Sequence, residues 1–199
     1  MIEDCTAIIL AGGDSQRMGR DKANLMLGEQ TLLQRVIAIM QQIFPQVIIS
    51  VRQLRPEINL PQVCDEQPNE GMPGAGPLAG LVSGLGRVTT PWAFVVACDM
   101  PFVEPAMVEL LSKYRSKYQA VVPVVQGHPQ PLAAFYACSC LAVLRESLQM
   151  RDKSLRGALQ MLDVCYVEQA GILDADPRLR SFFDLDTPQD VEKALHGVK

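Results

Sequence analysis

Residues 10–22 are Leu10-Ala11-Gly12-Gly13-Asp14-Ser15-Gln16-Arg17-Met18-Gly19-Arg20-Asp21-Lys22, and they directly follow a short apolar run at 7–10. A fully apolar run of this length predicts a β-strand that is buried on both faces. The two glycines let backbone N–H groups approach a ligand, and the cations Arg17, Arg20 and Lys22 add positive charge to the same loop. Ligands of open α/β sheets bind outside the carboxyl ends of the strands. The segment therefore predicts an α/β fold with a phosphate-binding loop; the alternative is a solvated turn with ordinary surface charges.

This loop matches neither of the two common nucleotide-binding motifs. A P-loop requires GxxxxGK[ST], but the spacing from Gly13 to Gly19 is wrong and Arg20 follows. The GxGxxG fingerprint of dinucleotide-binding folds is also absent. Any phosphate binding must therefore come from the glycine turn together with the convergent cations.

Short apolar runs alternate with helical periods along the chain. Strands are predicted for runs rich in β-branched and aromatic residues and bounded by turns, namely 7–10, 47–51, 92–98, 120–125, 132–137, 164–167 and 182–185. Apolar residues at helical spacing predict helices over about 32–43, over 78–85, from Pro105 and from about Thr187. This alternation predicts right-handed crossovers and a three-layer αβα sandwich around a Rossmann-like, mostly parallel sheet.

The composition excludes several broad classes of protein. Hydrophobic residues make up 48% of the 199 residues and charged residues 20%, which excludes disorder and a coiled coil as the main character. A net charge of −4 makes nucleic acid an unfavourable partner. No apolar run approaches the roughly 20 residues that span a bilayer, and we expect no membrane association. The six cysteines contain no CxxC pair, and with no export signal at the N-terminus they indicate reduced thiols in a cytoplasmic protein.

An aspartate ends the most apolar run of the chain. Asp99 follows residues 92–98, and Pro101 stops the strand, so the carboxylate stands on the expected ligand side of the sheet. Mg²⁺ takes oxygen ligands and is commonly held by one or two carboxylates together with substrate phosphates. Asp99 is therefore a candidate magnesium ligand; the alternative is that it caps the helix near Pro105 or forms a turn.

Two further segments are candidates for nucleotide contacts. Asp65 follows the short run 62–64, and its carboxylate can accept hydrogen bonds from guanine N1–H and N2–H₂ or from ribose hydroxyls. The alternative is an exposed loop aspartate. Gly76 and Pro77 precede the predicted helix 78–85, where the loop backbone can contact a flat base, unless it is an ordinary glycine-rich turn.

The second half of the chain offers candidates for a second substrate. Residues 126–131 lie between two predicted strands and include His128, for which a catalytic role is not required because a phosphate needs no general base to attack. Three cations within 151–156 precede a helical period and suit an acceptor phosphate; the alternative is a solvated charged face. Asp184 and Asp186 are two residues apart and point the same way on an extended chain. We hypothesise that one of them, preferably Asp186, helps Asp99 to hold a metal, whereas the alternative is that Asp186 only caps the next helix.

The combined motifs resemble one family of nucleotidyltransferases. The pattern LAGGxSxRMGxDKA at residues 10–23 is similar to that of the molybdenum cofactor guanylyltransferases, although sugar-phosphate and cytidylyl enzymes share its first part. The resemblance continues, in order along nearly the whole chain, in Gly76-Pro77-Leu78-Ala79-Gly80-Leu81, Cys98-Asp99-Met100-Pro101-Phe102, Gln130-Pro131-Leu132 with Phe135-Tyr136, and Asp186-Thr187-Pro188-Gln189-Asp190.

This resemblance implies an enzyme with the nucleotidyltransferase fold that transfers GMP from GTP to the phosphate of molybdopterin, with Mg²⁺ as cofactor. It implies a single domain over 1–199, with a nucleotide-binding part at about 1–105 and an acceptor-binding part at about 106–199. Transient contacts with other molybdenum cofactor proteins are expected. The implied site residues are catalytic Arg17, Lys22 and Asp99; nucleotide-binding Leu10, Ala11, Gly12, Gly13, Lys22, Asp65, Gly76, Pro77 and Asp99; and metal-binding Asp99. To these the residue pattern itself adds Asp186 as a candidate second metal ligand and Gln130, Arg156 and Asp184 as candidates for acceptor binding.

The chain departs from the family pattern at two places. Ser50 stands where relatives have an asparagine after the second strand, and Asp184 and Asp186 replace the asparagines of an N-x-N-T-P pattern. Two alternatives stay open at this point: a related nucleotidyltransferase that uses CTP or another acceptor phosphate, and a non-catalytic nucleotide-binding protein. The carboxylate of Asp99 argues against the second alternative.

Overall fold

Strand β1 (Cys5–Leu10) lies inside the sheet and explains the apolar character of the first predicted strand. It pairs in parallel with β4 (Gln46–Val51) on one side and with β6 (Trp92–Ala97) on the other. All six of its residues are buried.

The computed structural model describes residues 1–12, 22–65, 76–150, 154–185, 190, 192 and 194.

The main sheet has the order β10-β7-β9-β6-β1-β4-β5, with β8 paired to β7. The strands not yet given are β5 (Gln62–Cys64), β7 (Ala120–Val125), β8 (His128–Pro129), β9 (Ala133–Ala137) and β10 (Val164–Glu168). Only β8 and β9 run against the other strands of this sheet. The sheet is thus mixed but mostly parallel, as predicted. A separate two-stranded ribbon joins β2 (Met26–Leu27) to β3 (Gln30–Thr31).

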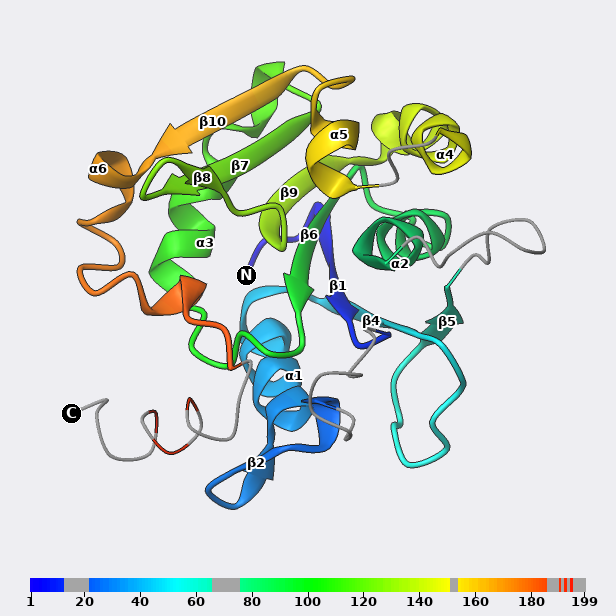
Figure 1. Ribbon diagram of the computed structural model, residues 1–199, viewed down its shortest axis with the longest axis vertical. Helices are drawn as coiled ribbons and strands as arrows, with labels where there is room; N and C mark the ends of the chain where they lie inside the picture. The colour runs from blue at the N-terminus through cyan, green and yellow to red at the C-terminus, as the bar shows by residue number, and fades with distance from the viewer. Residues whose placement is uncertain are drawn as a thin grey trace.

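Helices cover both faces of the sheet (Figure 1). One face packs against α1 (Leu32–Ile43) and α3 (Pro105–Ser112), whose apolar residues share one buried cluster. The other face of the sheet packs against α2 (Gly76–Leu85), α4 (Leu141–Gln149) and α5 (Leu155–Leu159). A short α6 (Gln169–Ile172) follows β10. Alternate residues of β1 enter the two clusters, Ala7 and Ile9 the first and Ile8 and Leu10 the second, because successive side chains point to opposite faces.

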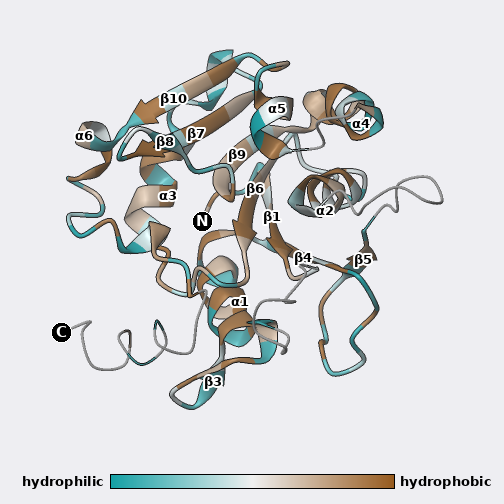
Figure 2. Cartoon of the chain, viewed as in Figure 1, coloured by the Kyte–Doolittle hydropathy of each residue, from teal (hydrophilic) through white to brown (hydrophobic). Residues whose placement is uncertain are grey.

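The predicted αβα sandwich is therefore confirmed, and its apolar residues concentrate in the central strands and on the inner faces of the helices (Figure 2). The first cluster is centred on three aromatic rings: Phe94 lies 5.6 Å from Phe44 and 4.9 Å from Phe135 between ring centroids.

Among the described helices, none has the length and apolar content needed to cross a membrane. All six cysteines are free thiols.

The strand predicted for 182–185 is wrong. Residues Arg180–Phe182 form a 3-10 turn instead, and the chain then becomes extended without pairing to a strand. The reason is Asp176, whose carboxylate accepts the backbone N–H groups of Arg180 and Ser181 at 3.0 and 2.8 Å and bends the chain there. The helix predicted from about Thr187 begins outside the described residues, although Asp190, Glu192 and Ala194 are helical.

Candidate active site

Four parallel strands end at the same edge of the sheet and bring the predicted nucleotide-binding residues together. Backbone bonds continue past the strand ends: Ala11 N–H donates to the Ser50 carbonyl at 2.8 Å, and Asp65 N–H donates to the Val51 carbonyl at 2.9 Å. On the other side of β1, Cys98 N–H donates to the Leu10 carbonyl at 3.1 Å. These bonds fix the chain beyond β1, β4, β5 and β6, so the edge is preorganised before any ligand binds.

The carboxylate of Asp65 is packed between this edge and helix α2. Ser50 Oγ donates a hydrogen bond to Asp65 Oδ1. A Cβ on Gly12 would overlap Asp65 Oδ2, and a Cβ on Gly80 would lie 2.8 Å from Ser50 Oγ and 3.3 Å from Asp65 Oδ1. Both glycines therefore make room for the carboxylate, which is half-buried and not the exposed loop aspartate of the alternative interpretation.

Burial raises the pKa of Asp65 above its ordinary value. The hydrogen bond from Ser50 and the charge of Arg52 act in the opposite direction and favour the carboxylate. Ser50 itself is only 1% exposed and is engaged with Asp65. The serine that replaces the family asparagine thus acts here through the orientation of Asp65.

In the binding mode that the resemblance implies, with Asp65 in contact with GTP, we expect Ser50→Ala to weaken GTP binding about tenfold at neutral pH, because Asp65 loses the hydroxyl that donates to it and fixes its orientation. The variant also removes an interaction that lowers the pKa of Asp65, so the loss of affinity on acidification should begin at a higher pH than in the wild type. Titration of GTP binding against pH tests this. The control is Ser83→Ala, which removes another buried hydroxyl that donates to the Ala79 carbonyl. Equal pH profiles for Ser50→Ala and the wild type would contradict the coupling.

Lys22 and Asp99 meet although they are far apart in the sequence. The 3-10 turn Lys22–Asn24 places Lys22 Nζ 3.0 Å from Asp99 Oδ2, and the two side chains are 24% and 18% exposed. Asp99 stands two residues beyond the end of β6, as predicted. Two of the three predicted catalytic residues therefore form one partly exposed ion pair at the carboxyl edge. The third, Arg17, lies outside the described residues, as does Gly13.

The residues around Asp99 fit a magnesium ion that receives most of its ligands from a substrate. Mg²⁺ commonly uses one or two protein carboxylates and completes its shell with phosphates and water. In the described part of the chain no group of three or more His, Cys, Asp or Glu side chains could hold a metal. Asp99 alone would therefore depend on a bound triphosphate. Asp186 lies outside the described residues, but the preceding Leu185 donates its N–H to the Asp99 carbonyl at 3.0 Å.

The other predicted residues are placed as follows. Gly76, with a positive φ of +52°, and Pro77 are exposed in the first turn of α2. Gln130 lines a cavity of about 600 Å³ beside β7 and β8. Arg156 is exposed on α5 and is not part of the lining of that cavity, and Asp184 is exposed just before Leu185. The acceptor-binding roles of Arg156 and Asp184 stay predictions.

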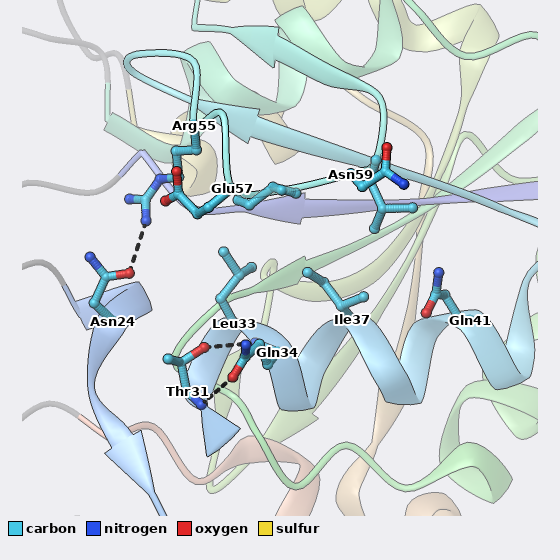
Figure 3. A pocket seen from close by; sticks show the side chains of 11 residues that line it. Asn24, Thr31, Leu33, Gln34, Ile37, Gln41, Arg55, Glu57 and Asn59 are labelled. Atoms are coloured by element: carbon cyan, nitrogen blue, oxygen red, sulfur yellow. Dashed lines mark hydrogen bonds between the residues drawn. The ribbon is translucent and has the colours of Figure 1, made fainter. Parts of the chain in front are cut away.

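Arg55 is a residue of this edge that the sequence pattern does not reveal. Its guanidinium donates to the Ala11 carbonyl at 3.5 Å and to Asn24 Oδ1 at 3.4 Å. It therefore links the two chain segments that flank residues 13–21. Arg55 also lines a smaller cavity of about 260 Å³ between α1 and the chain after β4 (Figure 3). A lone arginine in a polar segment gives no sequence signal, because its role appears only once β1 and β4 are adjacent.

The mostly parallel sheet, with Gly12, Asp65 and the Lys22–Asp99 pair at its carboxyl edge, defines an α/β protein whose ligand site is expected at the ends of the strands. Residues 7–165 match the family model described as the MobA-like NTP transferase domain, and the chain belongs to this family.

A protein from Chloroflexus aggregans, named probable molybdenum cofactor guanylyltransferase, is 37% identical over 94% of this chain and 91% of its own length. The crystal structure of molybdopterin-guanine dinucleotide biosynthesis protein A from Archaeoglobus fulgidus has a TM-score of 0.82 and 26% identity, covering 96% of this chain and 97% of that one. A Mycobacterium tuberculosis protein solved as a complex with manganese has a TM-score of 0.63 and 16% identity over 96% and 97% of the two chains, and so shows the fold alone.

Proposed function

We propose that the protein transfers GMP from GTP to the terminal phosphate of molybdopterin, forming molybdopterin guanine dinucleotide and releasing pyrophosphate. The observation that carries this proposal is the convergence of Gly12, Asp65 and the Lys22–Asp99 pair at one edge of the sheet. Membership of the MobA-like NTP transferase family and the names of the relatives support the same reaction. The six free thiols support a cytoplasmic setting.

The donor nucleotide lies along the ends of β1, β4 and β5. Backbone groups of residues 10–13 contact the nucleotide, and Gly76 and Pro77 contact the base from the start of α2. Asp65 accepts hydrogen bonds from guanine N1–H and N2–H₂. Its packing against Gly12 and Gly80 leaves the carboxylate little freedom to reorient, which favours the recognition of one base.

The acceptor phosphate attacks the α-phosphorus of GTP in line. A new P–O bond forms as the bond between the α-phosphorus and the bridging oxygen breaks, and pyrophosphate leaves with that electron pair. Such a reaction depends mainly on positioning and charge stabilisation. Lys22 and Arg17 hold the triphosphate and the developing charge. Asp99 would hold Mg²⁺, and the ion would supply further charge neutralisation.

The two halves of the chain bind different substrates in this proposal. Residues of about 1–105 provide the nucleotide contacts and both members of the Lys22–Asp99 pair. Residues of about 106–199 provide the acceptor side around Gln130, with Arg156 and Asp184 as further candidates. Transient contacts with other molybdenum cofactor proteins would deliver the acceptor and collect the product.

A comparison of the four nucleoside triphosphates with Mg²⁺ tests the donor. A ligand present at 100 times its Kd stabilises the folded protein by about 2.7 kcal/mol, which a thermal-shift assay detects. We expect GTP alone to produce this shift, whereas a larger shift with CTP would favour the cytidylyl alternative. Pyrophosphate release that requires both GTP and molybdopterin would exclude a non-catalytic binding protein.

We expect Lys22→Ala to weaken GTP binding and to lower turnover while the fold stays intact. Lys22 is partly exposed, and its ion pair with Asp99 is of the surface type, so the contribution of this pair to stability is small, about 0–1 kcal/mol. Steady-state kinetics with GTP and the unfolding midpoint measure the two effects. Lys113→Ala, at an exposed position after α3, is the control. Wild-type kinetics in Lys22→Ala would remove this lysine from the site.

A further inference from the structure

The side chain of Gln62 holds the segment between β4 and β5 in one conformation. Its amide nitrogen donates to the carbonyls of Arg55 and Ile58 at 2.8 and 3.1 Å, and its amide oxygen accepts the N–H of Arg55 at 2.8 Å. Ile58 N–H closes a turn onto the Arg55 carbonyl at 3.1 Å, and Ile58 packs against the buried cluster shared by α1 and α3. The backbone of Arg55 is therefore fixed, which restricts where its side chain can reach.

The side chain of Arg55 extends from this segment to two other parts of the chain. Its Nη2 donates to the Ala11 carbonyl at 3.5 Å, and its Nη1 donates to Asn24 Oδ1 at 3.4 Å (Figure 3). The two bonds use different nitrogens of one planar guanidinium, whose donors have a fixed fork geometry. Arg55 therefore holds the end of β1 and the 3-10 turn Lys22–Asn24 at a set separation.

This 3-10 turn carries Lys22 and is also anchored to α1. Leu25 N–H donates to the Lys22 carbonyl at 3.0 Å, and Leu32 N–H, at the start of α1, donates to the Leu25 carbonyl at 2.9 Å. These bonds hold the turn against α1, whereas the Arg55 contacts hold it against the end of β1. The position of Lys22 relative to the sheet therefore depends on Arg55.

The end of β1 and Asp99 belong to the same preorganised edge. Cys98, which precedes Asp99, donates its N–H to the Leu10 carbonyl at 3.1 Å, and Leu10 precedes Ala11. A tie between Ala11 and the 3-10 turn is thus also a tie between that turn and Asp99. It helps to place Lys22 Nζ at 3.0 Å from Asp99 Oδ2.

We propose that Arg55 is a positioning residue of the nucleotide site, which fixes the turn Lys22–Asn24 to the end of β1 and so sets where the Lys22 ammonium meets the triphosphate. Arg55 acts through Asn24 and Lys22 and does not itself touch the reacting atoms. This inference rests on the proposed function, because that function makes Lys22 a ligand of the triphosphate. Its physical basis is the steep dependence of catalysis on placement, since an error of about 1 Å can cost about 100-fold.

A lysine at position 55 distinguishes a bridge between two acceptors from a plain positive charge. Arg55→Ala removes both, whereas Arg55→Lys keeps the charge but has one compact ammonium in place of the fork. We expect each variant to raise the Kd of GTP with Mg²⁺ about tenfold, because the bridge is lost in both. Arg87→Ala, at an exposed arginine after α2, is the control. A wild-type Kd in Arg55→Lys would show that Arg55 acts by its charge and would overturn the positioning role.

A double-mutant cycle tests whether Arg55 acts through Lys22. If Arg55 places Lys22, Arg55→Ala should cause no further loss of GTP affinity in a Lys22→Ala background. Asn24→Ala removes the exposed acceptor instead, and its effect should not add to that of Arg55→Ala. A merely structural role would lower the unfolding midpoint and add its effect to that of Lys22→Ala. Additive losses in the cycle, or an unchanged Kd in Arg55→Ala, would overturn the proposal.

Inorganic triphosphate separates failure of this inference from failure of the proposed function. It carries the phosphates without a base, so its binding depends neither on the choice of nucleotide nor on the acceptor. If the wild type does not transfer GMP but the cycle with inorganic triphosphate still couples Arg55 to Lys22, the proposed reaction is wrong and the positioning role stands. If GMP transfer occurs and the losses in Arg55→Ala and Lys22→Ala are additive with both ligands, the positioning role is wrong.

Discussion

Asp99→Asn is expected to lower turnover by a factor on the order of 10², the size of effect seen when one preorganised electrostatic element is lost. The amide keeps the shape of the side chain but removes the charge that pairs with Lys22 at 3.0 Å and that would neutralise Mg²⁺. The GTP affinity should fall less, because most of the proposed nucleotide contacts come from other residues. The unfolding midpoint should change little, because Asp99 is partly exposed beyond the end of its strand.

Turnover of Asp99→Asn across a magnesium titration provides the measurement. The rate should remain low at saturating Mg²⁺, and the half-maximal concentration should rise. Asp4→Asn is a matched control, because Asp4 also forms a 3.0 Å ion pair, with Arg115, away from the carboxyl edge. Wild-type turnover of Asp99→Asn at low Mg²⁺ would contradict the metal assignment. The same magnesium titration of Asp186→Asn tests Asp186 as the second predicted metal ligand. If the titration curves of Asp186→Asn and the wild type overlay, Asp186 is not a metal ligand.

The sequence predicts the parts of the fold that depend on local patterns. Fully apolar runs become β1, β6 and β7 because these strands are buried on both faces. The same logic locates Asp65 and Asp99, since Asp65 follows the short strand β5, Asp99 follows the apolar run 92–98, and parallel strands end at one edge. The reversed direction of β9 follows from chain length: only seven residues separate its start from the end of β7, too few for a parallel crossover.

Interactions between distant segments account for what the sequence could not predict. Residues 182–185 have the composition of a strand, but the Asp176 carboxylate captures two of the backbone donors just before them. The Lys22–Asp99 pair joins residues 77 positions apart. Arg55 has no local motif, because its contacts with Ala11 and Asn24 arise only when separate loops meet at the carboxyl edge.

Asp65→Asn is expected to change the preferred base from guanine to xanthine. In the proposed binding mode the carboxylate accepts hydrogen bonds from guanine N1–H and N2–H₂, whereas xanthine has a carbonyl in place of the amino group. An asparagine accepts from N1–H with its oxygen and donates to that carbonyl with its amide. Loss of a hydrogen bond to a charged group costs roughly 1.5–3 kcal/mol, so the GTP affinity should fall by about 10- to 100-fold while the XTP affinity rises.

Competition binding with GTP, XTP and 2′-deoxy-GTP measures this switch. Asp65 is held by Ser50 and packed against Gly12 and Gly80, so an asparagine of the same shape should occupy the same place. The Asp163→Asn variant, at an exposed aspartate before β10, controls for the loss of one charge. Asp65 would instead contact the ribose if Asp65→Asn weakened GTP without any gain for XTP and if the wild type discriminated against 2′-deoxy-GTP. That outcome would move the recognition of guanine to the backbone of residues 10–13 and to the start of α2, because these are the other groups that we propose to contact the nucleotide.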